Sequence, residues 1–133
     1  MDWCALLGRI LLAALFLPAG VEKLLDLQGT IGAVAGAGMP LANIVGPIGA
    51  AIEALAPLLL AIGLFTRFSA AALIVFTAVA SYYFHHFWNM TGEDRMTNEI
   101  NFWKNMAVIG GLFYVLGYGA GRIALDRWRT RRT

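Results

Sequence analysis

Charged side chains are scarce in this sequence, and their scarcity indicates the class of protein. Lysine, arginine, aspartate and glutamate make up 14% of the 133 residues, whereas hydrophobic residues make up 59%. A soluble domain usually carries about a quarter charged residues. One small core cannot bury so much apolar surface, so lipid must cover part of it. The formal charge of +2 is too small to indicate a nucleic-acid partner.

Cysteine is almost missing as well, since Cys4 is the only one. One cysteine excludes an internal disulfide, a CxxC redox pair and a thiolate metal cage within one chain. The sequence has no phosphate-binding loop and no metal motif, and Ser69 and Ser81 stand outside any nucleophile–base pattern. These patterns therefore indicate no catalytic group, and they leave open whether the protein is an enzyme.

Four long apolar segments fill most of the chain, at roughly residues 4–24, 42–65, 68–88 and 102–121. Each is close to the ~20 residues that cross a ~30 Å hydrocarbon layer. The first ends without a small-residue cleavage site, which favours a retained span over a signal peptide. The runs lack period-two alternation, which favours helices over barrel strands. The sequence predicts an all-α membrane protein, with residues 1–133 forming one bundle of four transmembrane helices.

The connections between these segments differ in length. Residues 25–41 predict a long Gly- and Ala-rich loop that lies on or dips into the membrane interface. The turn at Thr66 and Arg67 is so short that the second and third spans should form an antiparallel hairpin. Residues 89–101 predict a polar loop. Small residues four positions apart, such as Gly32 and Gly36, favour close packing within the bundle or in a homodimer.

Basic residues predict the orientation. An even number of spans places both termini and the turn at Thr66 on one side of the membrane. That side holds seven basic residues and the opposite side three. The seven are Arg9, Arg67, Arg122, Arg127, Arg129, Arg131 and Arg132, and the three are Lys23, Arg95 and Lys104. Because cytoplasmic flanks carry the excess of basic residues, both termini are predicted to be cytoplasmic.

Polar side chains at membrane depth are the candidates for function, because an unpaired charge there is unfavourable. Glu53 lies inside the second span, so it should face the bundle and either pair with a cation or hold a proton. Lys23, Lys104 and the pair His85 and His86 lie at the outer ends of the other spans. Adjacent helical residues point ~100° apart, so only one histidine can face straight inward. Together these residues predict an outward-facing ligand site formed by Lys23, Glu53, His85, His86, Lys104 and Asn105, with a structural ion pair as the alternative role of Glu53.

Arg9 lies on the inner half of the first span. Its side chain is long enough to reach the cytoplasmic headgroups, and this snorkelling is the favoured interpretation. A structural pair inside the bundle is the alternative. The two interpretations predict different responses to lysine, which can replace a snorkelling arginine but not a bidentate one.

Short motifs follow one another in order along nearly the whole chain. They are Gly8-Arg9, Gly20-x-x-Lys23-Leu24, Gly38-x-Pro40, Glu53, Gly63-Leu64-x-Thr66-Arg67, His86-x-Trp88, Phe102-x-Lys104-Asn105, Gly110-Gly111, Gly119-x-Gly121 and Asp126. In this order and spacing they resemble the DoxX family of small bacterial membrane proteins. Arg9, Arg67 and Asp126 are expected to be structural polar residues.

The resemblance implies a four-helix, multi-pass protein of the bacterial inner membrane. Some members look like membrane subunits of oxidoreductase systems acting on quinol or reduced sulfur compounds. The expected function is therefore a subunit or anchor of such a system, with the lipid bilayer and redox proteins as partners and a quinone or similar small molecule at the outer polar cluster. A non-enzymatic binder or transporter and a structural interaction protein are the alternatives.

Overall fold

A computed structural model describes residues 1–130, and those residues form helices without any strand. The elements are α1 (Asp2–Leu25), α2 (Leu27–Gly36), α3 (Ala42–Ile62), α4 (Thr66–Phe84), the short 3-10 helix η1 (Phe87–Asn89), α5 (Gly92–Tyr118) and α6 (Leu125–Thr130). The predicted all-α class is therefore confirmed for this part of the chain.

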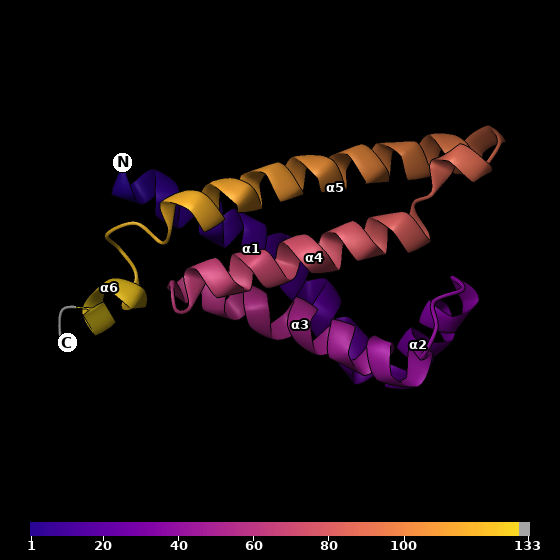
Figure 1. Ribbon diagram of the computed structural model, residues 1–133, viewed down its shortest axis with the longest axis horizontal. Coiled ribbons are helices and arrows are strands. Elements are labelled where there is room, and N and C mark those ends of the chain that lie inside the picture. The colour runs from indigo at the N-terminus through magenta and orange to yellow at the C-terminus, as the bar shows by residue number, and fades with distance from the viewer. Residues whose placement is uncertain (131–133) are drawn as a thin grey trace.

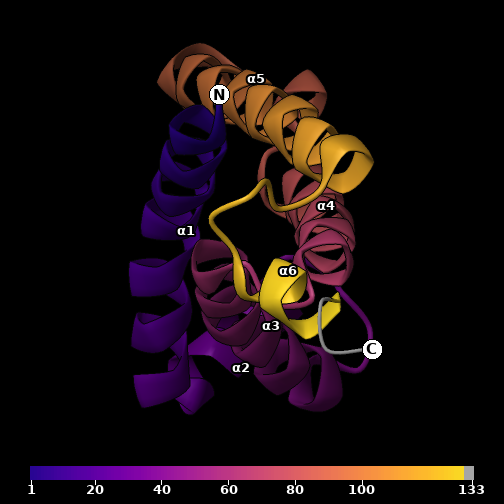
Figure 2. The same ribbon diagram turned by 90° about the vertical axis from the view of Figure 1, so that its left-hand side faces the viewer.

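Four long helices run side by side around one axis, as Figure 2 shows. α1 packs on α3, α3 on α4, and α4 on α5, while a smaller contact joins α5 to α1. The chain runs back and forth along the molecule (Figure 1). The start of α1, the α3–α4 turn and α6 lie together at one end, which we call the terminal end. α2 and η1 lie at the opposite end, which we call the far end.

The core lies where α1, α3, α4 and α5 meet. Its buried members are Phe16, Ala56, Leu60, Ala70, Leu73 and Leu112. Many of the other buried positions are alanine or glycine, so α1 and α3 approach each other closely along much of their length. Small residues at helix contacts are typical of bundles in lipid, where close backbone approach supplies much of the packing energy.

The outside of the bundle is apolar. Leu11 on α1, Leu55 on α3 and Val75 on α4 are each more than half exposed, and many other large apolar side chains also face outward. Three helical stretches of the described chain are long and apolar enough to cross a membrane: Asp2–Leu25, Ala42–Ile62 and Thr66–Asn89. α5 has 27 residues, but its first turns carry acidic and basic side chains that lower its mean hydropathy.

Two predicted loops are wrong, because both contain helix. Residues 25–41 hold α2, whose first turn is capped by the Asp26 carboxylate accepting a hydrogen bond from Gly29 N–H at 3.0 Å. Residues 89–101 hold the first turns of α5. Glu93 and Asp94 stand near its N-terminus, where the helix dipole favours acidic groups. Arg131 and Arg132, which were assigned to the cytoplasmic side, lie outside the described residues.

Candidate functional site

A cavity of about 1150 Å³ lies between α3 and α4 and extends inward to α1 and α2. Most of its wall consists of alanine, valine, isoleucine and phenylalanine side chains. Its polar and charged lining residues are Glu22, Lys23, Asp26, Thr30, Glu53, Thr77, His85 and Asn105. An apolar cavity with a few convergent polar groups is the usual form of a small-molecule site.

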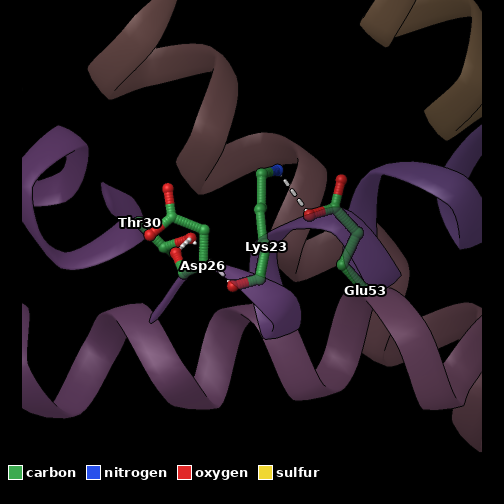
Figure 3. A network of polar contacts seen from close by, with 4 residues as sticks. All are labelled: Lys23, Asp26, Thr30 and Glu53. Carbon is green, nitrogen blue, oxygen red and sulfur yellow. Dashed lines mark hydrogen bonds and ion pairs between the residues drawn. The ribbon is translucent and has the colours of Figure 1, made fainter. Parts of the chain in front are cut away.

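Lys23 and Glu53 form an ion pair at the centre of these polar groups. The Lys23 ammonium lies 2.5 Å from Oε2 of Glu53 (Figure 3). The Glu53 side chain is 8% exposed, whereas the Lys23 side chain is 43% exposed. Burial of the carboxylate requires a partner, and the ammonium supplies it. Because an ammonium has three N–H donors and Glu53 takes one, Lys23 can still donate to a ligand in the cavity.

Gly20 explains why this pair forms. It is buried against α3, and a Cβ at this position would overlap the backbone of Glu53 and Ala54. Only glycine allows α1 to approach α3 so closely here. Lys23 follows three residues later, on the same face of α1. The contact at Gly20 therefore brings the lysine directly over Glu53.

The corner between α1 and α2 holds the lysine end of the site in place. The Thr30 hydroxyl donates to the backbone carbonyls of Lys23 at 3.0 Å and Asp26 at 2.9 Å, as Figure 3 shows. The bond to Lys23 satisfies a carbonyl group in the last turn of α1, where carbonyls lack partners within the helix, and the bond to Asp26 adds to the one from the Thr30 N–H. They also fix α2 as one wall of the cavity, because Thr30, Ala33 and Val34 all line it.

The other residues predicted for the site divide into two groups. His85 and Asn105 line the cavity with Lys23 and Glu53. His85 Nδ1 donates to Asn98 Oδ1 at 2.9 Å, which leaves Nε2 as an acceptor in the neutral ring. His86 Nδ1 instead lies 2.9 Å from the carbonyl of Tyr83, and His86 is not part of the cavity lining. Lys104 is exposed and does not line the cavity either.

Sequence reasoning missed several lining residues. Thr30 and Asp26 fall in the segment predicted as a loop, although Asp26 followed three residues later by Gly29 is consistent with a helix N-cap. Phe76 carries no polar signal, yet its ring lies 5.7 Å from the Lys23 ammonium. Within residues 1–130, no group of three His, Cys, Asp or Glu side chains is arranged to hold a metal ion.

A second polar cluster closes the terminal end. Arg9 is 1% exposed, and its guanidinium donates to the carbonyls of Leu60 at 3.1 Å, Ala61 at 3.2 Å and Ile123 at 2.5 Å. The favoured prediction that Arg9 snorkels to the headgroups is therefore wrong. Its fork of donors instead binds carbonyls in the last turn of α3, together with the carbonyl of Ile123 before α6.

Asp126 and Arg67 belong to the same end. The Asp126 carboxylate accepts hydrogen bonds from the N–H groups of Phe65 at 2.8 Å and Thr66 at 2.9 Å, so α6 caps α4 from outside the helix. Burial raises the pKa of Asp126, but hydrogen bonds from Thr66 and Phe65 and the charge of Arg129 together lower it by more, so the pKa lies below its usual value. Arg67 donates to the carbonyl of Gly117 at 3.1 Å, near the end of α5.

The sequence matches the profile of the DoxX family over residues 4–86, which include nearly all of α1 to α4 and every lining residue of the cavity except Asn105. The chain belongs to the DoxX family. The resemblance seen in the sequence is thus confirmed. The match ends before α5, so Asn105 lies beyond the matched region of this DoxX protein.

Two curated relatives bear on the DoxX assignment. The inner membrane protein YphA of Escherichia coli K12 is 34% identical over 122 residues, which cover 92% of this chain and 87% of that protein. A surfeit locus protein 4 homolog of Schizosaccharomyces pombe is 30% identical over 67 residues, which cover 49% of this chain and 22% of that protein. No solved structure matches the chain. The chain thus combines a DoxX family match with three described helices that are long and apolar enough to cross a membrane.

Proposed function

We propose that this DoxX protein binds a quinone-like molecule in the cavity between α3 and α4, as the membrane subunit or anchor of an oxidoreductase system. The observation that carries the proposal is the ion pair of Lys23 and Glu53, which lies among a few other polar side chains in a mostly apolar cavity. Placing charged side chains at membrane depth is energetically unfavourable, and such residues commonly mark ligand or proton sites.

The pair suits a ring that carries carbonyl or hydroxyl groups. Lys23 keeps N–H donors for a carbonyl oxygen, and Glu53 keeps a second carboxylate oxygen that can accept from a hydroxyl. His85 Nε2 and Asn105 add further polar groups on the same cavity. A quinone would supply two-electron redox chemistry, and these side chains would bind and orient either its oxidised or its reduced form.

The same proposal includes four membrane crossings with both termini in the cytoplasm. α5 packs along α4 and returns the chain to the terminal end, as a fourth crossing requires. Its part from Phe102 to Tyr118 holds one formal charge, Lys104, within 17 residues. The seven-to-three distribution of basic residues then puts the terminal end inside and the far end, nearer the Lys23–Glu53 pair, outside.

The test is substitution of Glu53 with glutamine, which keeps the shape and removes the charge. Binding of a decyl-substituted benzoquinone is measured in lipid nanodiscs by quenching of tryptophan fluorescence. We expect affinity to fall by about tenfold or more, equivalent to about 1.4 kcal/mol. Thermal unfolding should change less than binding does, because the amide oxygen of glutamine can still accept a hydrogen bond from the Lys23 ammonium. Glu99→Gln, which removes a carboxylate from an exposed pair on α5, is the matched control.

A second variant separates a ligand role from a structural one. Glu53→Leu removes the carboxylate altogether, so it should also lose binding, and it should raise the thermal midpoint if burial of the carboxylate is unfavourable. Full binding by Glu53→Gln together with a collapsed thermal midpoint would instead identify the pair as structural and reject the site. Mass spectrometry of proteins and quinones that co-purify in mild detergent tests the association with a redox complex.

A further inference from the structure

The cavity is open toward the side of the bundle. α3 and α4 leave the tight turn at Gly63–Phe65 together and separate toward the far end (Figure 1). The cavity lining includes Ile48 on α3 and Phe68 and Val75 on α4, which are all more than half exposed. These side chains lie on helices long and apolar enough to span the membrane. The opening between α3 and α4 therefore faces the hydrocarbon of the bilayer.

Phe76 stands between this opening and the ion pair. A Cβ built at Gly49 of α3 would lie 3.6 Å from Cε2 of Phe76, which is van der Waals contact. The Phe76 ring also lies 5.7 Å from the Lys23 ammonium. At this level the gap between α3 and α4 is therefore bounded by a glycine on one side and one aromatic ring on the other. Both residues line the cavity.

The charges at the polar end favour a particular kind of head group. Four side chains with a formal charge line the cavity there: the basic Lys23 and the acidic Glu22, Asp26 and Glu53. One positive and three negative charges leave a net charge of minus two. Like charges repel strongly near a low-dielectric wall. A phosphate, sulfate or carboxylate head group is therefore disfavoured, and an uncharged head that donates and accepts hydrogen bonds is favoured.

The size of the cavity indicates that the ligand has more than a head. A volume of about 1150 Å³ exceeds the roughly 300–1,000 Å³ usual for small-molecule pockets. The polar side chains occupy one part of it, and the rest is lined by apolar residues such as Ile48, Ala72 and Val75. This apolar part matches a hydrocarbon chain, and it continues to the opening between the helices.

We infer that the ligand is an uncharged amphiphile taken from the bilayer, with its chain in the α3–α4 groove and its head past Phe76 at the Lys23–Glu53 pair. The inference rests on the proposed function and adds the source of the ligand, its charge and the place of its chain. It also assigns Gly49 a role, since a Cβ there already reaches van der Waals contact with Phe76 and a side chain as large as leucine would fill the groove.

The experiment compares two probes, a benzoquinone ring without a chain and the same ring with a decyl chain, in nanodiscs of fixed lipid composition. Gly49→Leu should weaken binding of the decyl probe by about tenfold, as expected for overpacking, and leave the chainless ring within about twofold. The matched control is Gly110→Leu on α5, because a Cβ there meets no atom within 4 Å. A decyl probe carrying a diazirine at the chain end should label peptides of α3 and α4 around Ile48 and Val75.

The outcomes separate this inference from the proposed function. If the wild-type protein binds neither probe, the proposed function and this inference both fail. If both probes bind and depend on Glu53, but Gly49→Leu weakens them equally or not at all, the site stands and the side entrance is wrong. Labelling of α2 or of the connection before α5 would place the chain elsewhere and overturn the inference. Tight binding of a phosphate-headed decyl probe would reject the preference for an uncharged head.

Discussion

Arg9 and Glu53 are both buried, but they have different kinds of partner. The difference indicates a structural role for Arg9 and a ligand-binding role for Glu53. Arg9 is 1% exposed, and its two terminal nitrogens bind three backbone carbonyls of the fold. Glu53 is buried too, but its partner Lys23 remains 43% exposed toward a cavity. A group with free donors beside an open space can bind a ligand, whereas a group with its donors committed cannot.

Arg9 should tolerate no substitution well, including lysine. The guanidinium reaches the end of α3 and the backbone before α6 at once, through Leu60 and Ile123. A lysine ammonium is a single point and cannot span both groups of carbonyls. We expect Arg9→Lys to lower stability by about 2 kcal/mol, since buried carbonyls lose their donors. Thermal unfolding in detergent measures the change.

Arg122→Lys is the control for the Arg9 substitution. Arg122 is an exposed arginine at the same end, and its Nε lies 3.9 Å from the Asp2 carboxylate. Exposed pairs contribute about 0–1 kcal/mol, so this variant should unfold close to the wild-type midpoint. Equal midpoints for Arg9→Lys and Arg122→Lys would show that Arg9 does not join the helices.

Asp126 predicts a dependence of stability on pH. Its pKa is lowered in the folded protein, because the N–H groups of Phe65 and Thr66 and the charge of Arg129 outweigh the effect of burial. A carboxylate with a lowered folded pKa stabilises the fold above its unfolded pKa of about 4, and this contribution is lost as the pH falls through the folded value. Replacing Asp126 by alanine should therefore lower stability at pH 7 by about 1 kcal/mol, as for other helix caps.

The difference between wild type and Asp126→Ala should shrink in acid, because the wild-type carboxylate then takes up a proton. Thermal midpoints measured at pH 7 and at about pH 3 provide the comparison. Glu93→Gln, at an exposed residue in the first turn of α5, is the control. If the difference in thermal midpoint between wild type and Asp126→Ala is the same at both pH values, Asp126 stabilises the fold through packing and not through its charge.

At the scale of the helices, the apolar runs predicted the spans well but not the connections. The second predicted span, at residues 42–65, begins where α3 begins and ends three residues beyond it. The sequence pattern did not indicate α2 as a helix, because Gly29, Gly32 and Gly36 are poor helix formers. The helix depends instead on the Asp26 cap and on packing against α3. The charged first turns of α5 predict a loop when hydropathy alone is used, because hydropathy indicates contact with lipid and not helix.

Helix phase limited what could be predicted of the site. The depth of Glu53 in its span predicts a cation partner from a neighbouring span end, and Lys23 and Lys104 are both candidates. The structure pairs Glu53 with Lys23. Neighbouring residues point ~100° apart, so the sequence alone could not choose between His85 and His86. Asn105 donates to Ser81 across the α4–α5 contact, and this turns the adjacent Lys104 outward.

The contact between α1 and α3 should be sensitive to a single methyl group. Gly20→Ala would place a Cβ against the backbone of Glu53 and Ala54, so α1 must move away from α3. We expect a loss of about 1–3 kcal/mol from overpacking, together with weaker quinone binding as Lys23 leaves Glu53. Gly8→Ala on the same helix meets no atom within 4 Å and should be neutral or stabilising by up to about 1 kcal/mol. Opposite signs for the two alanines are the result to look for, and equal effects would reject the close contact.

At the scale of the whole molecule, polar interactions are divided between two ends. The terminal end joins three separate parts of the chain through Arg9, Asp126 and Arg67, so the ends of α3, α4 and α5 are tied together there. The far end has a cavity that reaches between α3 and α4. A bundle that is tied at one end and open at the other can admit a ligand without separating its helices completely. The orientation in the membrane decides which compartment lies nearer the open end.

Reporter fusions test that orientation and the number of crossings together. The basic residues at the terminal end predict that a reporter fused after Thr133 is active in the cytoplasm, and that one inserted at Gly92 is active outside. Gly92 is exposed at the start of α5, and a Cβ there meets no atom within 4 Å, so an insertion should be accommodated. The segment of α5 from Phe102 to Tyr118 forms about 26 Å of helix, which is close to the length of one crossing. If α5 crosses, the two reporters lie on opposite sides of the membrane. A third reporter at Gly38, between α2 and α3, should agree with the one at Gly92.

If the reporters at Gly92 and after Thr133 gave the same side, α5 would lie along the membrane surface and the protein would cross three times. If all three positions were reversed, the Lys23–Glu53 end would face the cytoplasm, and redox partners would have to be sought there.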